Sequence, residues 1–311
     1  MIQIKHPHLE QFAQEHYENL KNKLTKFPSN TKYSLKEVIT AKPDKLDEIA
    51  GWFNALTNNS FKVPTRGTPT SLCRGNPLWL PSKSIYNFMI RKYKNFTTKT
   101  KIDYDAYDLA QKLQVNICPY CNINHTYTII QENDKKITRP EFDHFYDKDT
   151  YPILALSFYN LIPSCHICNS TLKGRTNFSI KTHLNPYSDD FNKLAQFELK
   201  IENSNFYHSI NGFELNLESK DRRAIKNIND FKLQDLYQNH KDIVLELIQK
   251  NAIYNESYID ELMTQYEGTL FKNREDLLRH ITCGYITDEE IGKRPLSKLI
   301  KDISTELGLN Q

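Results

Sequence analysis

The chain has 311 residues, which is long enough for one large domain or roughly two to three small ones. Hydrophobic residues make up 39% of it and aromatic residues 12%, with only 9 glycines, which argues against a disordered chain. No stretch approaches the roughly 18 apolar residues of a membrane span, and the N-terminus lacks the apolar core of a signal peptide. The sequence therefore predicts a cytoplasmic protein.

The net charge of +3 conceals an uneven distribution. Between Ile49 and Ile102 there is no Asp or Glu, and this basic segment carries nine cations: Lys62, Arg66, Arg74, Lys83, Arg91, Lys92, Lys94, Lys99 and Lys101. Such segregation favours a surface that faces a polyanion. The end of the segment, "SIYNFMIRKYKNFTTKTK", interleaves aromatic residues with Arg91, Lys92 and Lys94, which makes these three candidate nucleic-acid contacts. An amphipathic helix with a solvated basic face explains the same pattern.

Helical spacing dominates the first part of the chain. Apolar residues recur three and four apart in "LEQFAQEHYENLKNKL" (9–24) and "LDEIAGWFNAL" (46–56), which predicts two helices. The stretch "VPTRGTPTSLCRGNPLWLPS" is typical of a loop, with a helix expected to start after Pro81. A further helix is predicted over "AYDLAQKLQV", just before Cys118.

After Cys118 the spacing of apolar residues changes from that of helices to that of strands. "HTYTII", the polar turn "QENDKK" and "ITRPEFDHF" predict a hairpin, and "QFELKI" and "GFELNLE" predict two more strands between 196 and 218. Helices return in "FKLQDLYQNHKDIVLELIQK" and "PLSKLIKDISTELGL", with Pro295 at a first helical position and Gly308 near the end. We expect a helical region over 1–104, a mixed core over 105–190, a short hairpin over 191–218 and a helical region over 219–311.

Four cysteines form two C-x2-C pairs, Cys118–Cys121 and Cys165–Cys168. A disulfide is a poor explanation in a cytoplasmic chain. Each C-x2-C turn converges two thiolates, and two turns complete a tetrahedral Zn²⁺ site with no open position, so a structural zinc is predicted. Four buried free thiols are the alternative. Cys73 and Cys283 have no partner at such spacing.

Polar residues suited to hydrolysis lie among and after these cysteines: Asp143, His144, Asn160 and Asn169. A carboxylate and an amide oxygen suit Mg²⁺, and an uncharged His can take a proton from an attacking water. Neighbours on a strand point to opposite faces, so spacing alone does not put Asp143 and His144 in one pocket. Each residue also has a structural explanation, as a core His, a cap or an Asx-turn.

The segments "CPYC", "EFDH", "FYNLIPSCHICN" and "LKG", which span Cys118 to Gly174, together resemble the HNH endonucleases with a zinc-bearing ββα-metal (treble-clef) core. The resemblance implies an α+β fold, in which a mostly helical protein surrounds this small nuclease core and its structural zinc. It implies that His144 is the general base and that Asn160 braces the loop bearing it. Asp143 and Asn169 would hold a catalytic Mg²⁺ or Mn²⁺, and the four cysteines the zinc.

One stretch departs from the family pattern. Many members have a Pro after the His and a Gly-Gly before the middle Asn, which "FYDKDTYPILALSFYN" replaces here, so a different loop shape is expected. The residues around the motif are similar to the nuclease subunit of Septu-type antiphage systems. That resemblance implies an endonuclease that works beside an ATPase partner. Its substrate is expected to be nucleic acid, with DNA favoured over RNA, although the sequence itself leaves that choice open.

Three further residues and one rival function stay open. Lys173 and Arg175 are candidate phosphate contacts, with plain solvent exposure as the alternative. His183 could orient a phosphate or serve the core. The rival function is a non-catalytic zinc module that binds nucleic acid through the basic segment, with Asp143 and His144 as structural residues.

Overall fold

A computed structural model describes residues 2–27, 31–57, 79–98 and 104–309, with the side chains of 79–84 left out. Much of the basic segment therefore lies outside the described residues, as does Cys73. The protein is mixed α and β, with helices as the main element. The strands described form two-stranded antiparallel sheets. Among the described residues no helix is long and apolar enough to cross a membrane.

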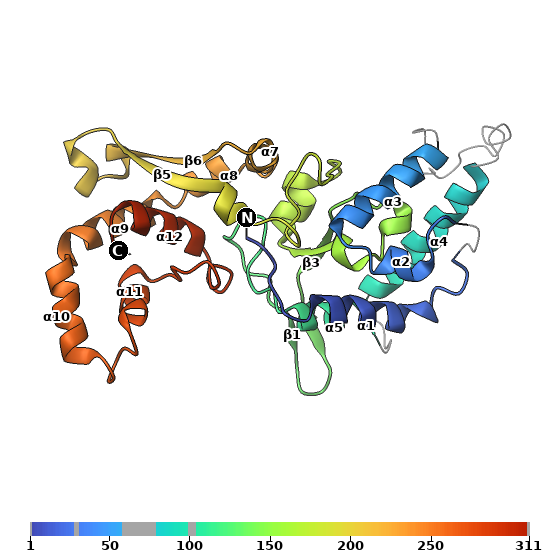
Figure 1. The fold of residues 1–311 in the computed structure, drawn as a ribbon, viewed down its shortest axis with the longest axis horizontal. Helices are drawn as coiled ribbons and strands as arrows, with labels where there is room; N and C mark the ends of the chain where they lie inside the picture. The colour runs from blue at the N-terminus through green and yellow to red at the C-terminus, as the bar shows by residue number, and fades with distance from the viewer. Residues whose placement is uncertain (1, 28–30, 58–78, 99–103, 310–311) are drawn as a thin grey trace. The chain divides into compact units, whose positions relative to one another are not determined.

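The chain folds into two compact units that interleave along the sequence (Figure 1). The N-terminal unit comprises Lys5–Val115 and Thr126–Ser188. The C-terminal unit comprises Met1–Ile4, Asn116–His125 and Asp189–Gln311. A segment holding the first C-x2-C pair thus belongs to the unit made mostly of the last third of the chain.

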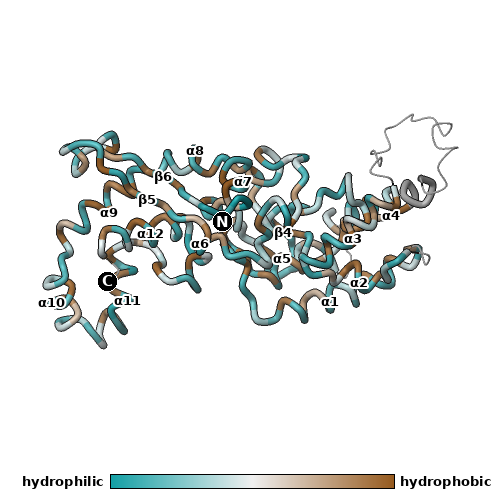
Figure 2. Tube along the Cα trace, turned by 45° about the horizontal axis from the view of Figure 1, so that its top comes forward, coloured by the Kyte–Doolittle hydropathy of each residue, from teal (hydrophilic) through white to brown (hydrophobic). Residues whose placement is uncertain are grey.

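The N-terminal unit begins with five helices, on which hydrophobic stretches alternate with hydrophilic ones (Figure 2): α1 (Leu9–Lys21), α2 (Leu35–Ile39), α3 (Pro43–Leu56), α4 (Trp79–Thr97) and α5 (Ala106–Leu113). The helices predicted over 9–24, 46–56 and 106–115 are confirmed. α4 begins at Trp79, three residues before the start predicted after Pro81, because the first turn of a helix tolerates proline. α2 begins with a capping box between Ser34 and Glu37.

The predicted hairpin is only partly present. β1 (Ile129–Ile130) pairs with β2 (Lys136–Thr138), but the segment "EFDH" forms a separate strand, β3 (Glu141–His144). Pro140 stands between β2 and β3 and has no backbone N–H to donate to a ladder. β3 instead pairs antiparallel with β4 (Leu161–Ser164), which sets Asp143 opposite Ile162.

A π-helix follows β4 directly and completes a strand–strand–helix arrangement. This helix, η4 (Ile167–Lys173), contains a bond from Gly174 N–H to the Asn169 carbonyl, five residues back. Such helices are rare and occur often at functional sites. Two short 3₁₀ turns, η2 (Pro152–Leu154) and η3 (Phe158–Asn160), lie in the connection between β3 and β4.

The C-terminal unit pairs β5 (Ala195–Ile201) with β6 (Phe213–Ser219), which confirms the two strands predicted there. Its helices are α6 (Phe191–Leu194), α7 (Arg222–Asp230), α8 (Leu233–Gln238), α9 (Lys241–Ile253), α10 (Glu256–Tyr266), α11 (Arg274–Thr282) and α12 (Ser297–Glu306). The helical spacing over "FKLQDLYQNHKDIVLELIQK" is confirmed and corresponds to two helices, separated at Asn239 and His240. α12 begins two residues after Pro295, and Gly308 follows it with a φ of +86°.

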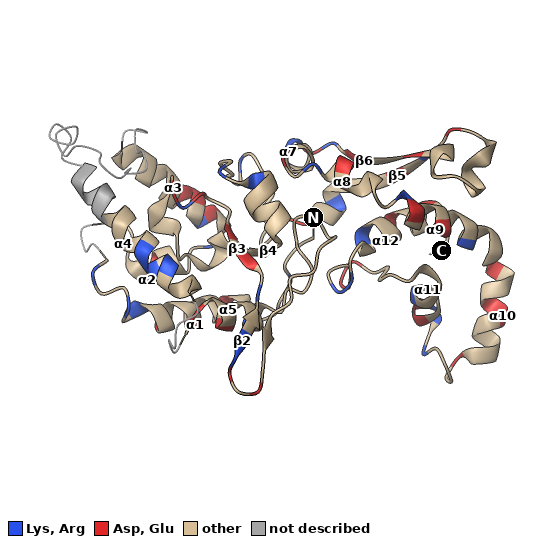
Figure 3. Ribbon diagram, turned by 180° about the vertical axis from the view of Figure 1, so that it is seen from behind, with Lys and Arg blue, Asp and Glu red and all other residues tan. Residues whose placement is uncertain are grey.

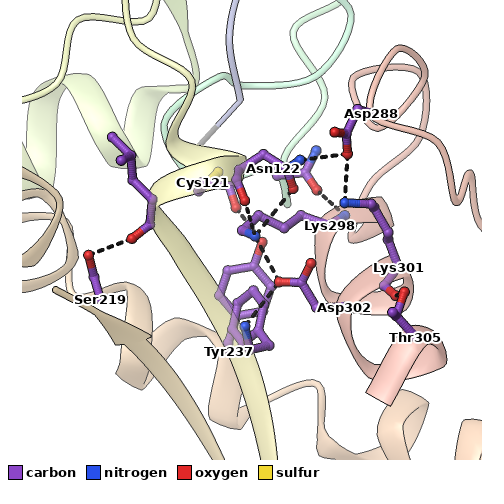
Figure 4. Close-up of polar contacts among 12 residues, drawn as sticks. Cys121, Asn122, Ser219, Tyr237, Asp288, Lys298, Lys301, Asp302 and Thr305 are labelled. Carbon is purple, nitrogen blue, oxygen red and sulfur yellow. Dashed lines mark hydrogen bonds and ion pairs between the residues drawn. The ribbon is translucent and has the colours of Figure 1, made fainter. Parts of the chain in front are cut away.

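The first C-x2-C turn is fixed to this unit by a buried asparagine (Figure 4). Asn122 donates to the Ile291 carbonyl at 3.0 Å. Its side-chain oxygen accepts from Lys298 N–H at 3.0 Å. Tyr237 donates its hydroxyl proton to the Cys121 carbonyl at 2.7 Å. The turn therefore takes its shape from α8 and the start of α12.

A buried ion pair joins α12 to β5. Lys298 Nζ lies 2.7 Å from Asp302 Oδ2, and their side chains are 1% and 5% exposed. The same Asp302 oxygen accepts the Phe197 N–H at 3.0 Å (Figure 4). Burial lowers the pKa of Lys298, and the charge of Asp302 opposes that effect. The pair has hydrogen-bond partners on both sides, as a buried pair requires.

His16 of α1 is a buried histidine in the N-terminal unit. Its Nδ1 lies 2.8 Å from the Tyr104 hydroxyl, and its Nε2 lies 2.9 Å from the Leu156 carbonyl. A carbonyl only accepts, so Nε2 carries the proton. Burial lowers the pKa of His16 to about 4, although the bond to Leu156 opposes the shift.

We expect His16 to make stability fall with acidification. The unfolded state takes up a proton on this imidazole below about pH 6.5 and the folded state does not, so the free energy of unfolding drops by about 1.4 kcal/mol per pH unit down to about pH 4. His16→Gln cannot titrate and should lose this share of the pH dependence. Urea unfolding at several pH values measures this pH dependence. Equal slopes of the free energy of unfolding against pH in the wild type and in His16→Gln would contradict the prediction.

Candidate active site and metal centre

The four cysteines of the C-x2-C pairs lie together. Cys118, Cys121, Cys165 and Cys168 are all buried, and their sulfur atoms lie within 4.8 Å of one another. Four thiols at this separation form a donor set that could bind a metal such as zinc, which prefers four tetrahedral sulfur ligands in structural sites. The predicted gathering of these cysteines is confirmed.

Several N–H groups point at the sulfur atoms. Ile123 N–H donates to Cys121 Sγ at 3.4 Å, and the Asn124 amide does so at 3.8 Å. Cys168 N–H donates to Cys165 Sγ at 3.5 Å. Hydrogen bonds to sulfur favour the thiolate, which is the form that binds a metal.

The alternation of side chains along β3 sorts the polar residues of the site into two groups. Glu141 and Asp143 share one face, and both contact η4. Phe142 and His144 share the other face, where the Tyr93 ring of α4 lies edge-on to His144 at a centroid distance of 4.4 Å. The neighbours Asp143 and His144 thus face different elements, as a strand requires.

Asp143 forms a buried ion pair with Lys173, the last residue of η4. Lys173 Nζ lies 3.0 Å from Asp143 Oδ1 and donates to the His144 carbonyl at 2.7 Å. The two side chains are 1% and 3% exposed. Lys173 was expected to contact phosphate or to face solvent; in this structure it is buried against β3 instead.

His144 is a neutral, oriented imidazole. Its Nε2 lies 3.0 Å from the Ala155 carbonyl, which fixes the proton on Nε2 and leaves the lone pair on Nδ1. Burial lowers the pKa of His144 to about 3, helped by the charges of Lys148 and Lys173. The residue has the protonation state that a base requires, although it is only 5% exposed.

Asn160 joins the two ends of the connection that follows His144. Its side-chain oxygen accepts Tyr146 N–H at 2.7 Å, and its amide donates to the carbonyls of Tyr146 and Leu154, each at 3.0 Å. The residue is fully buried, and every hydrogen bond it makes goes to this connection. Such contacts are those expected of a residue that braces the loop.

Asn169 lies on η4 opposite Glu141. Its Nδ2 donates to Glu141 Oε2 at 2.8 Å, and Ser170 Oγ donates to the same oxygen at 2.9 Å. His166 Nδ1 lies 2.8 Å from Glu141 Oε1. Burial alone would raise the pKa of Glu141, but these hydrogen bonds outweigh it and lower the pKa. The orientation leaves the Asn169 oxygen as an acceptor.

Sequence reasoning missed Glu141 and Tyr93 as parts of this site. Glu141 lies two residues before Asp143, so the period-two alternation of a strand was the signal that could have found it. Tyr93 donates its hydroxyl proton to the Phe142 carbonyl at 3.3 Å. It had no sequence signal, because its contact with His144 depends on how α4 packs.

The other expected nucleic-acid contacts are at the surface. Arg91 and Lys94 are exposed on α4, Lys92 is half-buried, and Arg175 is exposed one residue after Gly174. Figure 3 shows the cations of α4 as blue bands on the helix. Tyr93 lies on the same helix, so these cations belong to the element that covers His144.

His183 lies within the protein. Its ring stacks on Phe178 at a centroid distance of 3.6 Å, and its Nδ1 lies 2.9 Å from Thr182 Oγ1. It is 1% exposed, so the structure gives it packing contacts.

Asp143 and Asn169 have the donor types that suit a hard divalent cation. Asp143 offers a carboxylate on β3 and Asn169 an amide oxygen on η4, and these are the ligand types that Mg²⁺ and Mn²⁺ prefer. In this structure Asn169 is paired with Glu141, and Asp143 has an ammonium group on one of its oxygens. The Asp143 carboxylate therefore already holds a positive charge.

The cysteine cluster predicts the metal content. We expect purified protein to carry about one zinc per chain, and Cys165→Ser to lose that metal and to melt at lower temperature, because metal binding contributes folding free energy. Zinc analysis and thermal melting measure both. Cys283→Ser is the matched control, since Cys283 is exposed and outside the cluster; full zinc content in Cys165→Ser would refute the site.

Comparisons with known proteins give one partial similarity. The chain is 36% identical over 74 residues to the Septu protein PtuB of Bacillus thuringiensis. The matching stretch is 24% of this chain and 25% of PtuB, so it spans about a quarter of that relative's length. No family model matches the chain, and no solved structure does.

Proposed function

We propose that this protein is a metal-dependent HNH endonuclease that hydrolyses phosphodiester bonds in nucleic acid, with DNA as the favoured substrate. The observation that best supports the proposal is the neutral His144, oriented by the Ala155 carbonyl at the end of a strand that also carries Asp143. A module that only binds nucleic acid has no need of a neutral, oriented imidazole at the end of such a strand.

In this mechanism Asp143 and Asn169 would hold the divalent ion, Mg²⁺ or Mn²⁺. When bound, the ion supplies charge stabilisation to the phosphate and to its leaving oxygen. His144 takes a proton on Nδ1 from the water that attacks phosphorus, while the Ala155 carbonyl holds Nε2–H. The bond between phosphorus and the 3′ oxygen breaks as the bond to the attacking water oxygen forms, and the 3′ oxygen takes up a proton from solvent, which gives 5′-phosphate and 3′-hydroxyl ends. Asn160 keeps the connection after His144 in shape.

The exposed cations Arg91 and Lys94 of α4, together with Arg175, would bind the phosphate backbone. Phosphate contacts of this kind position a nucleic acid without reading its sequence. Because Tyr93 of the same helix touches His144, a backbone held on α4 lies near the base.

The similarity to PtuB supports a role in antiphage defence. We propose that the protein is the effector nuclease of such a system, working beside an ATPase partner. The partner would control when cutting occurs, since an unregulated endonuclease harms its own cell.

A second candidate is the non-catalytic zinc module that binds nucleic acid. The pairing of Lys173 with Asp143 favours it, because that carboxylate is already neutralised. Incubation of plasmid DNA with the protein and Mg²⁺, beside an EDTA control, separates the two. Cleavage that EDTA abolishes supports the nuclease, and binding without cleavage supports the module.

Loss of the base should stop cleavage. We expect His144→Ala to lower the cleavage rate by about 10² to 10⁴, which is the usual contribution of general-base assistance. Zinc content and DNA affinity should stay close to those of the wild type. Plasmid, single-stranded DNA and tRNA, each with Mg²⁺ or Mn²⁺, are the substrates to assay.

His208→Ala is the matched control, because His208 is exposed in the other unit. It should cut at the wild-type rate. A His144→Ala protein that also cut at the wild-type rate would show that His144 is not the base.

The cations of α4 predict a salt dependence. We expect Arg91→Gln combined with Lys94→Gln to weaken DNA binding and to reduce the slope of log K against log salt by about two, because each phosphate that a cation neutralises contributes about 0.9 to that slope. Fluorescence anisotropy at several salt concentrations measures the slope. Lys181→Gln is the control, because Lys181 pairs with Asp47 on the same unit; an unchanged slope in the double variant would exclude α4 from the interface.

A further inference from the structure

The Lys173 ammonium group already places a positive charge at the Asp143 carboxylate, where a metal ion would bind. Its ammonium group contacts Asp143 Oδ1 at 3.0 Å and the His144 carbonyl at 2.7 Å, and it lies 5.0 Å from the centroid of the Phe178 ring. All of these partners favour positive charge. The Lys173 side chain is also 1% exposed, so water contributes little to the stabilisation of its charge.

A divalent ion cannot join this arrangement without cost. An ion bound to the Asp143 carboxylate at about 2.1 Å would lie within a few ångström of the ammonium group. Like charges at that separation repel strongly in a buried site, where the effective dielectric constant is far below that of water. One of the two cations therefore has to leave the carboxylate.

The end of η4 gives the Lys173 side chain a route to the solvent. Lys173 is the last residue of η4, and Gly174 follows it with a φ of +51°, a conformation that suits glycine. The next residues, from Gly174 to Asn177, are exposed. A rotation of the Lys173 side chain past the end of the helix would thus bring the ammonium to the surface, where a phosphate could accept it.

We propose that Lys173 competes with the divalent ion for Asp143, so that the ion-free protein is held in a closed state and metal binding releases the lysine. This inference rests on the proposed function, because it takes Asp143 as a metal ligand. Competition lowers the apparent affinity for the ion by the fraction of molecules in which Asp143 is free. The same residue then sets the metal concentration at which the site becomes competent.

The C-terminal unit provides an internal comparison. Lys298 and Asp302 form a pair of similar burial, at 2.7 Å and with side chains 1% and 5% exposed. Both residues lie on one helix, and Asp302 also accepts the Phe197 N–H. That pair has a structural task at β5 and is expected not to respond to the divalent ion.

Metal affinity tests the competition without any nucleic acid. Mn²⁺ binding to the zinc-loaded full chain, followed by electron paramagnetic resonance, should tighten about tenfold or more in Lys173→Met, because the competing charge is gone. Lys148→Met removes a positive charge that also acts on His144 but makes no bond to Asp143, and it should change the affinity less than about threefold. Unchanged or weaker binding in Lys173→Met overturns the competition.

A second measurement uses the wild-type protein, in case Lys173→Met folds poorly. Lys173 should react slowly with an amine-acylating reagent in the ion-free protein and at least about tenfold faster when Mn²⁺ saturates, whereas Lys298 should stay slow in both. Mass spectrometry gives both rates in one sample. A Lys173 rate that ignores Mn²⁺ overturns the proposal.

Different results would overturn the competition and the proposed function. If Asp143→Ala binds Mn²⁺ as tightly as the wild type, then Asp143 is no ligand and both fall. If Asp143→Ala loses Mn²⁺ but Lys173→Met gains no affinity, the metal site stands and only the competition is overturned.

Discussion

Three consecutive backbone carbonyls, those of Leu154, Ala155 and Leu156, receive the hydrogen bonds on which the N-terminal unit depends. They accept from Asn160, His144 and His16 respectively. A buried carbonyl left without a donor would cost about 1–3 kcal/mol. The Leu154 carbonyl also accepts the Ser157 N–H, so His144 and His16 are the donors that matter most to this segment. In this way α1, the end of β3 and the turn before β4 meet at a single short stretch of chain.

This stretch also sets the chemical state of the histidines. A carbonyl fixes the proton on Nε2 of both His16 and His144, and burial keeps both imidazoles neutral. The difference lies in the neighbours. His16 uses its other nitrogen in a hydrogen bond with the Tyr104 hydroxyl, as a core residue does, whereas His144 lies at the end of the strand that carries Asp143. A neutral imidazole alone therefore does not identify a base; the residues around it do.

Local patterns predicted most elements, because helix and strand periods depend on near neighbours in sequence. The helices over 9–24 and 46–56 and the pair β5–β6 follow from such patterns, and the C-x2-C spacing identified the cysteines that gather. The pairing of β3 was missed, because Pro140 ends one hairpin and the new partner lies about twenty residues on. The interleaving of the two units likewise has no local signal.

By itself the sequence determined which chemical groups are present: the four cysteines, the Asp-His step and two asparagines, at spacings that resemble a hydrolytic site. Only the tertiary structure decided how these groups are used. It paired Lys173 with Asp143, set Glu141 against Asn169 and turned the apolar stretch "YPILALSF" into the acceptor that orients His144. The physical reason is that residue types and their periods are local, whereas burial and hydrogen-bond partners depend on segments distant in the chain.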